Sequence, residues 1–153
     1  MRRAYVLERT QVVPVAIDEA FGFFADPRNL EQITPPWLRF RIVEGPLELR
    51  AGAVLRYRLE LFRIPVSWRT VIAGWTPPRG FVDVQRHGPY ALWEHVHRLT
   101  PHGDQTEIYD HVSYRLFGGP FGRVVHALVV RRWLDEIFDF RADALVARFG
   151  KAS

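Results

Sequence analysis

The chain has 153 residues, of which 48% are hydrophobic and 25% are charged, values that are ordinary for one globular domain. It contains no cysteine, which excludes a disulfide framework, a thiolate zinc site and a cysteine nucleophile. No apolar stretch approaches the roughly 18 residues that a membrane span needs, and the charged N-terminal residues Glu8 and Arg9 do not fit a secretory signal, so we expect a cytoplasmic protein.

The net charge is +4 at pH 7, and nearly all of the positive charge is arginine, because Lys151 is the only lysine. A cluster of arginines would favour a nucleic-acid or anionic-lipid surface. Here the arginines are scattered along the chain and interleaved with Glu and Asp, which is typical of an ordinary solvated surface. We therefore expect no nucleic-acid partner and no stable membrane insertion.

The first predicted elements are a strand and two short helices. Residues 3–13 are rich in β-branched and aromatic side chains, which favours a strand. A helical spacing follows, with apolar residues at Ile17, Ala20, Phe21 and Phe24. Asp26-Pro27 then supplies an N-cap and a first helical position, which predicts a second short helix over residues 27–33.

A series of short strands follows, because apolar and polar side chains alternate between turn signals rich in proline and glycine. The predicted strands cover residues 38–42, 53–62, 64–75, 81–85, 90–99 and 106–116. Turns of hairpin length connect them, which indicates an antiparallel meander.

The spacing becomes helical after Gly118-Gly119-Pro120 and stays so to Phe149. The first half of this helix, residues 124–130, is apolar nearly all round. Such a segment is usually covered on more than one side. We therefore expect the interior cavity to lie against residues 124–133, with a homodimer contact as an alternative cover.

The hairpin formed by residues 90–116 carries the candidate chemistry. With His102-Gly103 as the central turn residues, His95 lies opposite Asp110. This register places eight side chains on one mainly apolar face: Trp93, His95, His97, Leu99, Ile108, Asp110, Val112 and Tyr114. We expect that face to point into the interior.

Three roles are open for the pair of His95 and Asp110. The pair can fix the two strands as a satisfied polar contact, anchor a polar group of a ligand, or perform acid–base catalysis. His95 and His97 with one Asp also resemble a two-histidine, one-carboxylate metal site. No third strong ligand is apparent in the sequence, so neither a metal nor another cofactor is expected.

Four further polar residues lie on strands, and their role depends on whether their side chains point inward or outward. If Phe81 points inward, Asp83 and Gln85 do so as well, and the sequence leaves this choice open. Arg58 and Arg69 are expected to point outward, because arginine is mostly exposed.

The order of elements resembles the helix-grip fold of the START-like superfamily (SRPBCC), at the residue level its bacterial polyketide cyclase/dehydrase-like and lipid-transfer-like members. The segments that carry this resemblance are residues 23–30, 34–36, 64–68, 81–83, 88–90 and 93–97. The resemblance covers the whole chain and implies one α+β domain over residues 1–153. In that fold a curved antiparallel sheet of about seven strands surrounds a long C-terminal helix, with two short helices after the first strand. No catalytic residue is carried over, because this fold hosts unrelated functions.

The resemblance further implies an internal cavity that binds a hydrophobic small molecule, such as a lipid, polyketide or aromatic compound, as a carrier or sensor. The alternative is a cyclase- or dehydratase-like enzyme that uses His95 and Asp110. The residues expected to contact the ligand are Phe24, Leu30, Trp37, Leu59, Trp68, Phe81, Trp93, His95, His97, Asp110, Tyr114, Leu128 and Trp133. Because this wall includes polar groups, we expect an apolar ligand with one hydrogen-bonding group.

Overall fold

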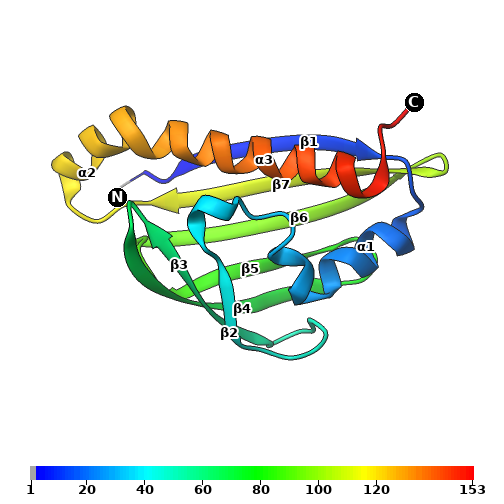
Figure 1. Cartoon of the computed structure of the whole chain (residues 1–153), viewed down its shortest axis with the longest axis horizontal. Coiled ribbons are helices and arrows are strands. Elements are labelled where there is room, and N and C mark those ends of the chain that lie inside the picture. The colour runs from blue at the N-terminus through cyan, green and yellow to red at the C-terminus, as the bar shows by residue number, and fades with distance from the viewer. Residues whose placement is uncertain (1–2) are drawn as a thin grey trace.

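The computed structural model describes residues 3–153 and is drawn in Figure 1. The N-terminal part contains β1 (Tyr5–Val13), α1 (Ile17–Ala25) and two 3-10 helices, η1 (Pro27–Leu30) and η2 (Pro36–Leu38). The strands that follow are β2 (Arg41–Glu44), β3 (Val54–Leu61), β4 (Ile64–Thr76), β5 (Gly80–His87), β6 (Leu92–His102) and β7 (Gln105–Arg115). The chain ends in α2 (Gly119–Val125), the π-helical segment η3 (His126–Val130) and α3 (Arg131–Phe149).

The seven strands form one antiparallel sheet in the order β1-β7-β6-β5-β4-β3-β2. The last six form the predicted meander, and β1 closes the other side by pairing with β7, so that Tyr5 faces Tyr114. Figure 1 shows the sheet curving beneath α3, which runs along β1 and β7. The α+β helix-grip architecture predicted from the sequence is therefore confirmed.

The short elements after α1 differ in detail from the prediction. The second helix is a single 3-10 turn that ends at Leu30, and the strand expected from Leu38 begins only at Arg41. The reason is local, because residues 36–38 form η2 and Arg39 then takes a left-handed conformation with φ of 47°. Extended pairing can start only after that residue.

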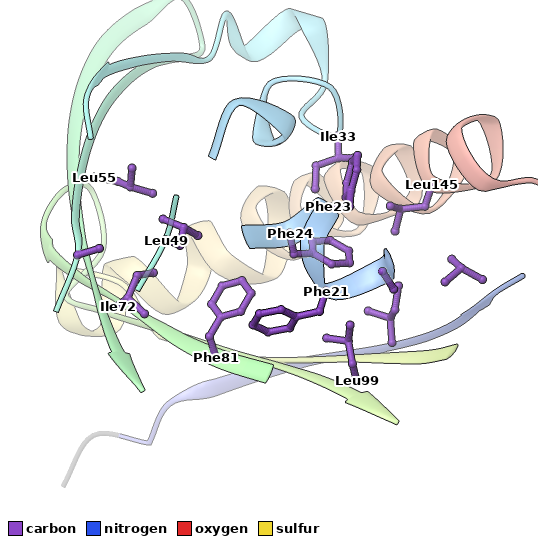
Figure 2. Close-up of a cluster of buried hydrophobic side chains, with 14 residues drawn as sticks. Phe21, Phe23, Phe24, Ile33, Leu49, Leu55, Ile72, Phe81, Leu99 and Leu145 are labelled. Carbon is purple, nitrogen blue, oxygen red and sulfur yellow. The ribbon is translucent and has the colours of Figure 1, made fainter. Parts of the chain in front are cut away.

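Two apolar clusters fill the concave face of the sheet. The first surrounds α1, and Figure 2 shows Phe21 and Phe24 of that helix pointing toward Phe81, Leu99 and Leu145. The second lies beneath the start of α3 and is rich in aromatic rings. Its buried members are Leu59, Trp68, Tyr90, Trp93, Val112, Tyr114, Leu134 and Phe138.

The terminal helix is packed in its second half and exposed in its first, and of the predicted range 124–133 only Trp133 lines the cavity. In α3 the buried residues are Leu134, Phe138, Arg141 and Leu145, spaced along one helical stripe. In the preceding segment, by contrast, Leu128 is 73% exposed and Val124 is 54% exposed. The apolar half lies at one end of the molecule (Figure 1), where no part of the described chain covers those side chains. No helix among residues 3–153 is long and apolar enough to cross a membrane.

Candidate functional site

A cavity of about 170 Å³ lies between the sheet and α3. Its walls come from η1, η2, strands β3 to β6 and α3, and they are mainly aliphatic and aromatic. Eight of the side chains predicted to contact a ligand line it: Leu30, Leu59, Trp68, Phe81, Trp93, His95, His97 and Trp133. Along α3 the cavity lies against residues 133–141, so its position is shifted toward the C-terminus from the predicted one.

Three predicted contact residues lie away from this cavity. Leu128 projects outward from the exposed half of the helix. Trp37 is 51% exposed and makes a T-shaped ring contact with Phe140 of α3. Phe24 is buried in the cluster around α1. Hydropathy and aromatic character alone did not separate these three side chains from those of the wall.

Tyr114 and Asp110 are buried but stand behind the cavity wall. The hydroxyl of Tyr114 lies 2.7 Å from Nε2 of His126 in the π-helical segment, and the ring of His126 stacks on Tyr5. Tyr114 therefore ties the terminal helix to the sheet. Asp110 contacts His95 and His97.

In the hairpin of β6 and β7 the side chains point to the predicted sides of the sheet, but the two strands pair in a different register. Its two turn residues are Gly103 and Asp104, so His97 lies opposite Asp110. Gly103 has φ of 66°, which fits glycine at the first central position of a tight hairpin turn. The predicted register is therefore wrong by two residues. A shift of two keeps each side chain on its face, and all eight predicted inward residues are buried.

Five polar side chains contact one another in the interior, and we call them the polar cluster: Asp83, His95, His97, Asp110 and Arg141. Nε2 of His95 lies 2.7 Å from Oδ1 of Asp110, and Nε2 of His97 lies 2.6 Å from Oδ2 of Asp83. From α3, Nη2 of Arg141 donates to Oδ1 of Asp110 at 3.2 Å. The two imidazole rings stack at 3.6 Å between centroids. The cluster thus joins β5, β6, β7 and α3.

The electrostatics hold both carboxylates of the polar cluster in the ionised form. Burial favours the neutral acid, but Arg141 and the two histidines outweigh it and hold the pKa of Asp110 well below its usual range. Burial opposes ionisation of Asp83 as well, and the hydrogen bond from His97 reverses this and lowers the pKa of Asp83. Both groups therefore act as acceptors at neutral pH.

The pKa values of the two histidines are shifted in opposite directions. Burial, reinforced by the neighbouring His97, lowers the pKa of His95. Burial acts on His97 in the same sense, but its hydrogen bonds to Asp110 and Asp83 prevail and raise the pKa of His97. A neutral His95 that donates Nε2–H to Asp110 keeps the lone pair of Nδ1, a tautomer assigned from these partners. Such a nitrogen can accept a proton or a hydrogen bond.

The polar cluster also contains a set of groups that could hold a metal ion. Asp83, His95 and His97 each offer a ligand atom, and these atoms lie within 4.8 Å of one another. The sequence did not identify Asp83 as a third ligand, because it left open whether the Asp83 side chain points inward. The structure settles that facing, since Asp83 lines the cavity together with Phe81.

Two buried N–H donors on cavity-lining residues have no hydrogen-bond partner within the described part of the chain. They are Nε1 of Trp68 and Nε of Arg141. A buried donor left unpaired costs about 1–3 kcal/mol. Each belongs to a residue whose side chain is part of the cavity wall.

Arg141 is the residue of this site that the sequence reasoning missed. A signal was present, because Arg141 stands three residues after Phe138 and four before Leu145, on the apolar stripe of the helix. A charged residue at a stripe position indicates a buried partner. The other polar residues of uncertain facing lie elsewhere. Gln85 binds the backbone of Tyr90, and both Arg58 and Arg69 are exposed.

No protein-family model matches the chain, and no curated protein sequence matches it. Solved structures do. A START superfamily protein from Mycobacterium smegmatis matches with a TM-score of 0.67 and 16% identity over 94% of this chain and 96% of its own. The major latex-like protein 151 of Panax ginseng matches with a TM-score of 0.68 and 12% identity over 97% of this chain and 99% of its own.

A third structure, protein Ms6760 from Mycobacterium smegmatis, matches with a TM-score of 0.71 and 17% identity over 97% of this chain and 92% of its own. All three likenesses extend over nearly the whole chain, and identities this low establish the fold alone. The chain therefore has the START-like helix-grip fold.

Proposed function

We propose that the chain binds a compact, neutral, largely apolar molecule in the cavity, as a carrier or sensor, and that the molecule presents a hydrogen-bond acceptor to the wall. The observation that carries this proposal is the pair of unpaired buried donors, Trp68 Nε1 and Arg141 Nε, on residues that line a mainly apolar cavity. Apolar pockets with a few placed polar groups are typical of small-molecule sites.

The size of the cavity supports a compact ligand. Its volume is about 170 Å³, close to the roughly 150 Å³ of an engineered cavity that takes up benzene. Typical ligand pockets are larger, about 300–1,000 Å³. A single-ring compound suits this volume better than an extended acyl chain.

The charges of the polar cluster support a neutral ligand. Asp83 and Asp110 are ionised, and they lie beside the guanidinium of Arg141 and the imidazole of His97, whose pKa is raised. The ionised groups of the wall therefore already interact with one another, and an added ionic group would lack a counter-charge at a high desolvation cost. A carbonyl or ether oxygen can accept from the free donors without that cost.

Native mass spectrometry of freshly purified protein would test the proposal by detecting a small molecule that co-purifies. A thermal-shift series of single-ring ketones and phenyl ethers, with alkyl carboxylates for comparison, would define its class. We expect the neutral ring compounds to stabilise the protein and the carboxylates to leave it unchanged. If no compound of either kind raises the melting temperature, the proposal is wrong.

A matched tryptophan pair assigns the binding to the cavity. Trp68→Phe keeps a ring in the wall but removes the free donor, so ligand affinity should fall about 3- to 10-fold, the worth of one hydrogen bond. Trp37→Phe makes the same change outside the cavity, and the affinity should not change. Equal affinities in the two variants would contradict a role for the Trp68 donor.

A second candidate function is a cyclase- or dehydratase-like reaction, favoured by the contact of 2.7 Å between His95 and Asp110. In that reaction Nδ1 of His95 would take a proton from the carbon between the carbonyl and the hydroxyl-bearing carbon. The C–O bond would break, and the imidazolium would return the proton to the departing hydroxyl, which leaves as water. Asp110 would hold the imidazole in place. The test is elimination of water from a single-ring β-hydroxyketone. His95→Gln should abolish it while the partly exposed control His111→Gln retains it. Equal rates in both variants would reject this function.

A further inference from the structure

The exposed half of the terminal helix and the turn before it present large apolar side chains to solvent. Phe117 is 65% exposed, Phe121 is 74% exposed and Leu128 is 73% exposed, with Val124 between them at 54%. Single exposed apolar residues are common, but a contiguous group of this size marks an interaction surface. We call these four residues and the arginines described next the arginine–apolar end.

The arginines of this end come together in space although they are scattered in the sequence. Arg3, Arg115 and Arg123 line one groove between the start of β1 and α2, and no acidic residue lines it. Within residues 3–153 none of the three has an ion-pair partner. The chain between Asp110 and Asp135 contains no Asp or Glu. The groove therefore has a local positive charge, and Arg123 in its wall is followed directly by the exposed Val124.

The apolar surface continues toward the cavity. At the tip between β3 and β4, Phe62 is 69% exposed and Ile64 is 64% exposed. The ring of Phe62 stacks on Trp133 of α3 at 5.9 Å between centroids, and Trp133 lines the cavity. The hairpin tip and the terminal helix thus meet at the edge of the cavity.

We propose that the arginine–apolar end docks on the surface of an anionic phospholipid bilayer. The exposed phenylalanines and Leu128 would enter the boundary between headgroups and acyl chains, as the apolar face of an interfacial helix does. Arg3, Arg115 and Arg123 would bind lipid phosphates, which guanidinium groups recognise with paired hydrogen bonds. This proposal stands on residues other than those of the cavity ligand, so either can fail without the other.

The charge of this end favours a membrane over a second copy of the chain. A two-fold contact would bring the same arginines of two copies together, and like charges facing each other oppose association. An anionic bilayer supplies the opposite charge instead, and each arginine near such a surface strengthens binding about fivefold.

Co-sedimentation with vesicles tests the proposal. The full chain should bind vesicles of phosphatidylcholine mixed with phosphatidylglycerol and should remain free with phosphatidylcholine alone. Because salt screens exposed charges, binding should weaken as sodium chloride rises to about 0.5 M. Replacing part of the sodium chloride by inorganic phosphate at constant ionic strength should release no additional protein, which separates a bilayer surface from a site for free phosphate.

Paired variants separate the apolar from the ionic contribution. Phe121→Ser with Leu128→Ser should lower the vesicle partition coefficient at least about tenfold, and Arg123→Glu should lower it at least about fivefold. The matched controls are Leu47→Ser, at a residue 78% exposed in the loop before β3, and Arg86→Glu on β5. Circular dichroism should be unchanged in all four.

Three outcomes would overturn the proposal. The first is that the wild type does not bind the vesicles. The second is that the two control variants lose as much binding as the test variants. The third is that sedimentation velocity reveals a dimer that Phe121→Ser with Leu128→Ser dissociates. The last outcome would assign this surface to a second copy of the chain.

Discussion

The two halves of the terminal helix differ in a way that reverses the usual relation between hydropathy and burial. The first half, residues 119–130, is rich in valine, leucine and phenylalanine, yet most of these side chains face solvent. The second half, Arg131–Phe149, alternates charged and apolar residues, yet it covers the sheet and buries Arg141. What decides burial is whether the curved sheet reaches the helix at that point.

The difference also divides the possible functions of the molecule. The packed half contributes Trp133, Leu134, Ile137, Phe138 and Arg141 to the cavity. The exposed half contributes nothing to the cavity wall and instead forms the arginine–apolar end. One half therefore borders the cavity and the other faces solvent.

Removing the charge of Asp110 should have the largest effect on the packed half. Asp110→Asn leaves the buried guanidinium of Arg141 without its counter-charge, so we expect the free energy of unfolding to fall by about 3–5 kcal/mol. Asp139→Asn removes an exposed ion pair with Arg9 and should cost at most about 1 kcal/mol. Urea unfolding measures both, and equal losses would show that the polar cluster adds no more than a surface pair.

The same leucine truncation in the two halves tests the comparison directly. Leu134 is 3% exposed and Leu128 is 73% exposed. Leu134→Ala should lower the free energy of unfolding by about 2–5 kcal/mol through the cavity that it leaves. Leu128→Ala should change it by no more than about 0.5 kcal/mol. Similar costs at the two positions would mean that the first half of the helix is covered.

The lowered pKa of His95 predicts a loss of stability in acid. The unfolded chain binds a proton at His95 near pH 6.5, whereas the folded chain does so only at lower pH, so the contribution of His95 decreases as pH falls below 6.5. The advantage of wild type over His95→Gln in the free energy of unfolding should therefore shrink by about 2 kcal/mol between pH 7 and pH 5.

The raised pKa of His97 predicts the opposite pH dependence of stability. The contribution of His97 to the free energy of unfolding is present below pH 6.5 and is lost as pH rises through its higher folded pKa. Urea titrations at pH 7, 6 and 5 on wild type, His95→Gln and His97→Gln would separate the two. An advantage of wild type over His95→Gln that does not depend on pH would contradict the assignment for His95.

The smallest expected effect concerns the contact that ties the exposed half to the sheet. Tyr114→Phe removes the hydroxyl that contacts Nε2 of His126, and should cost about 1 kcal/mol because the buried imidazole loses its partner. Tyr109→Phe removes the solvent-accessible hydroxyl that donates to Glu8 and should be nearly neutral. Hydrogen exchange of residues 119–130 should rise in Tyr114→Phe alone, and an unchanged rate would contradict this tie.

The sequence predicted the order of strands and helices because alternation and helical spacing are local signals. The face of the hairpin was also predictable, since a register error of two residues leaves each side chain on its side of the sheet. The register could also have been predicted, because Gly103 followed by Asp104 is a typical two-residue hairpin turn, and Gly103 has the positive φ that this turn requires.

The residues of the site were harder to predict from the sequence. Arg141 comes to Asp110 from a helix 31 residues further along the chain, and only its position on the apolar stripe indicated burial. The assignment of Leu128 to the cavity was wrong because hydropathy reports what a helix can bury and does not report where the sheet ends. The same limit applies to Trp37, whose environment is set by the two 3-10 turns beside α3.

The pairing of β1 with β7 has a consequence for how the chain is made. Tyr5 leaves the ribosome about a hundred residues before its neighbour Tyr114, and at roughly 5–20 residues per second this delay lasts several seconds. During that time β1 has no edge to join, and Asp110 still lacks the arginine that balances its charge when buried. Closure of the sheet and dehydration of the polar cluster must therefore come late in synthesis, when the last helix arrives.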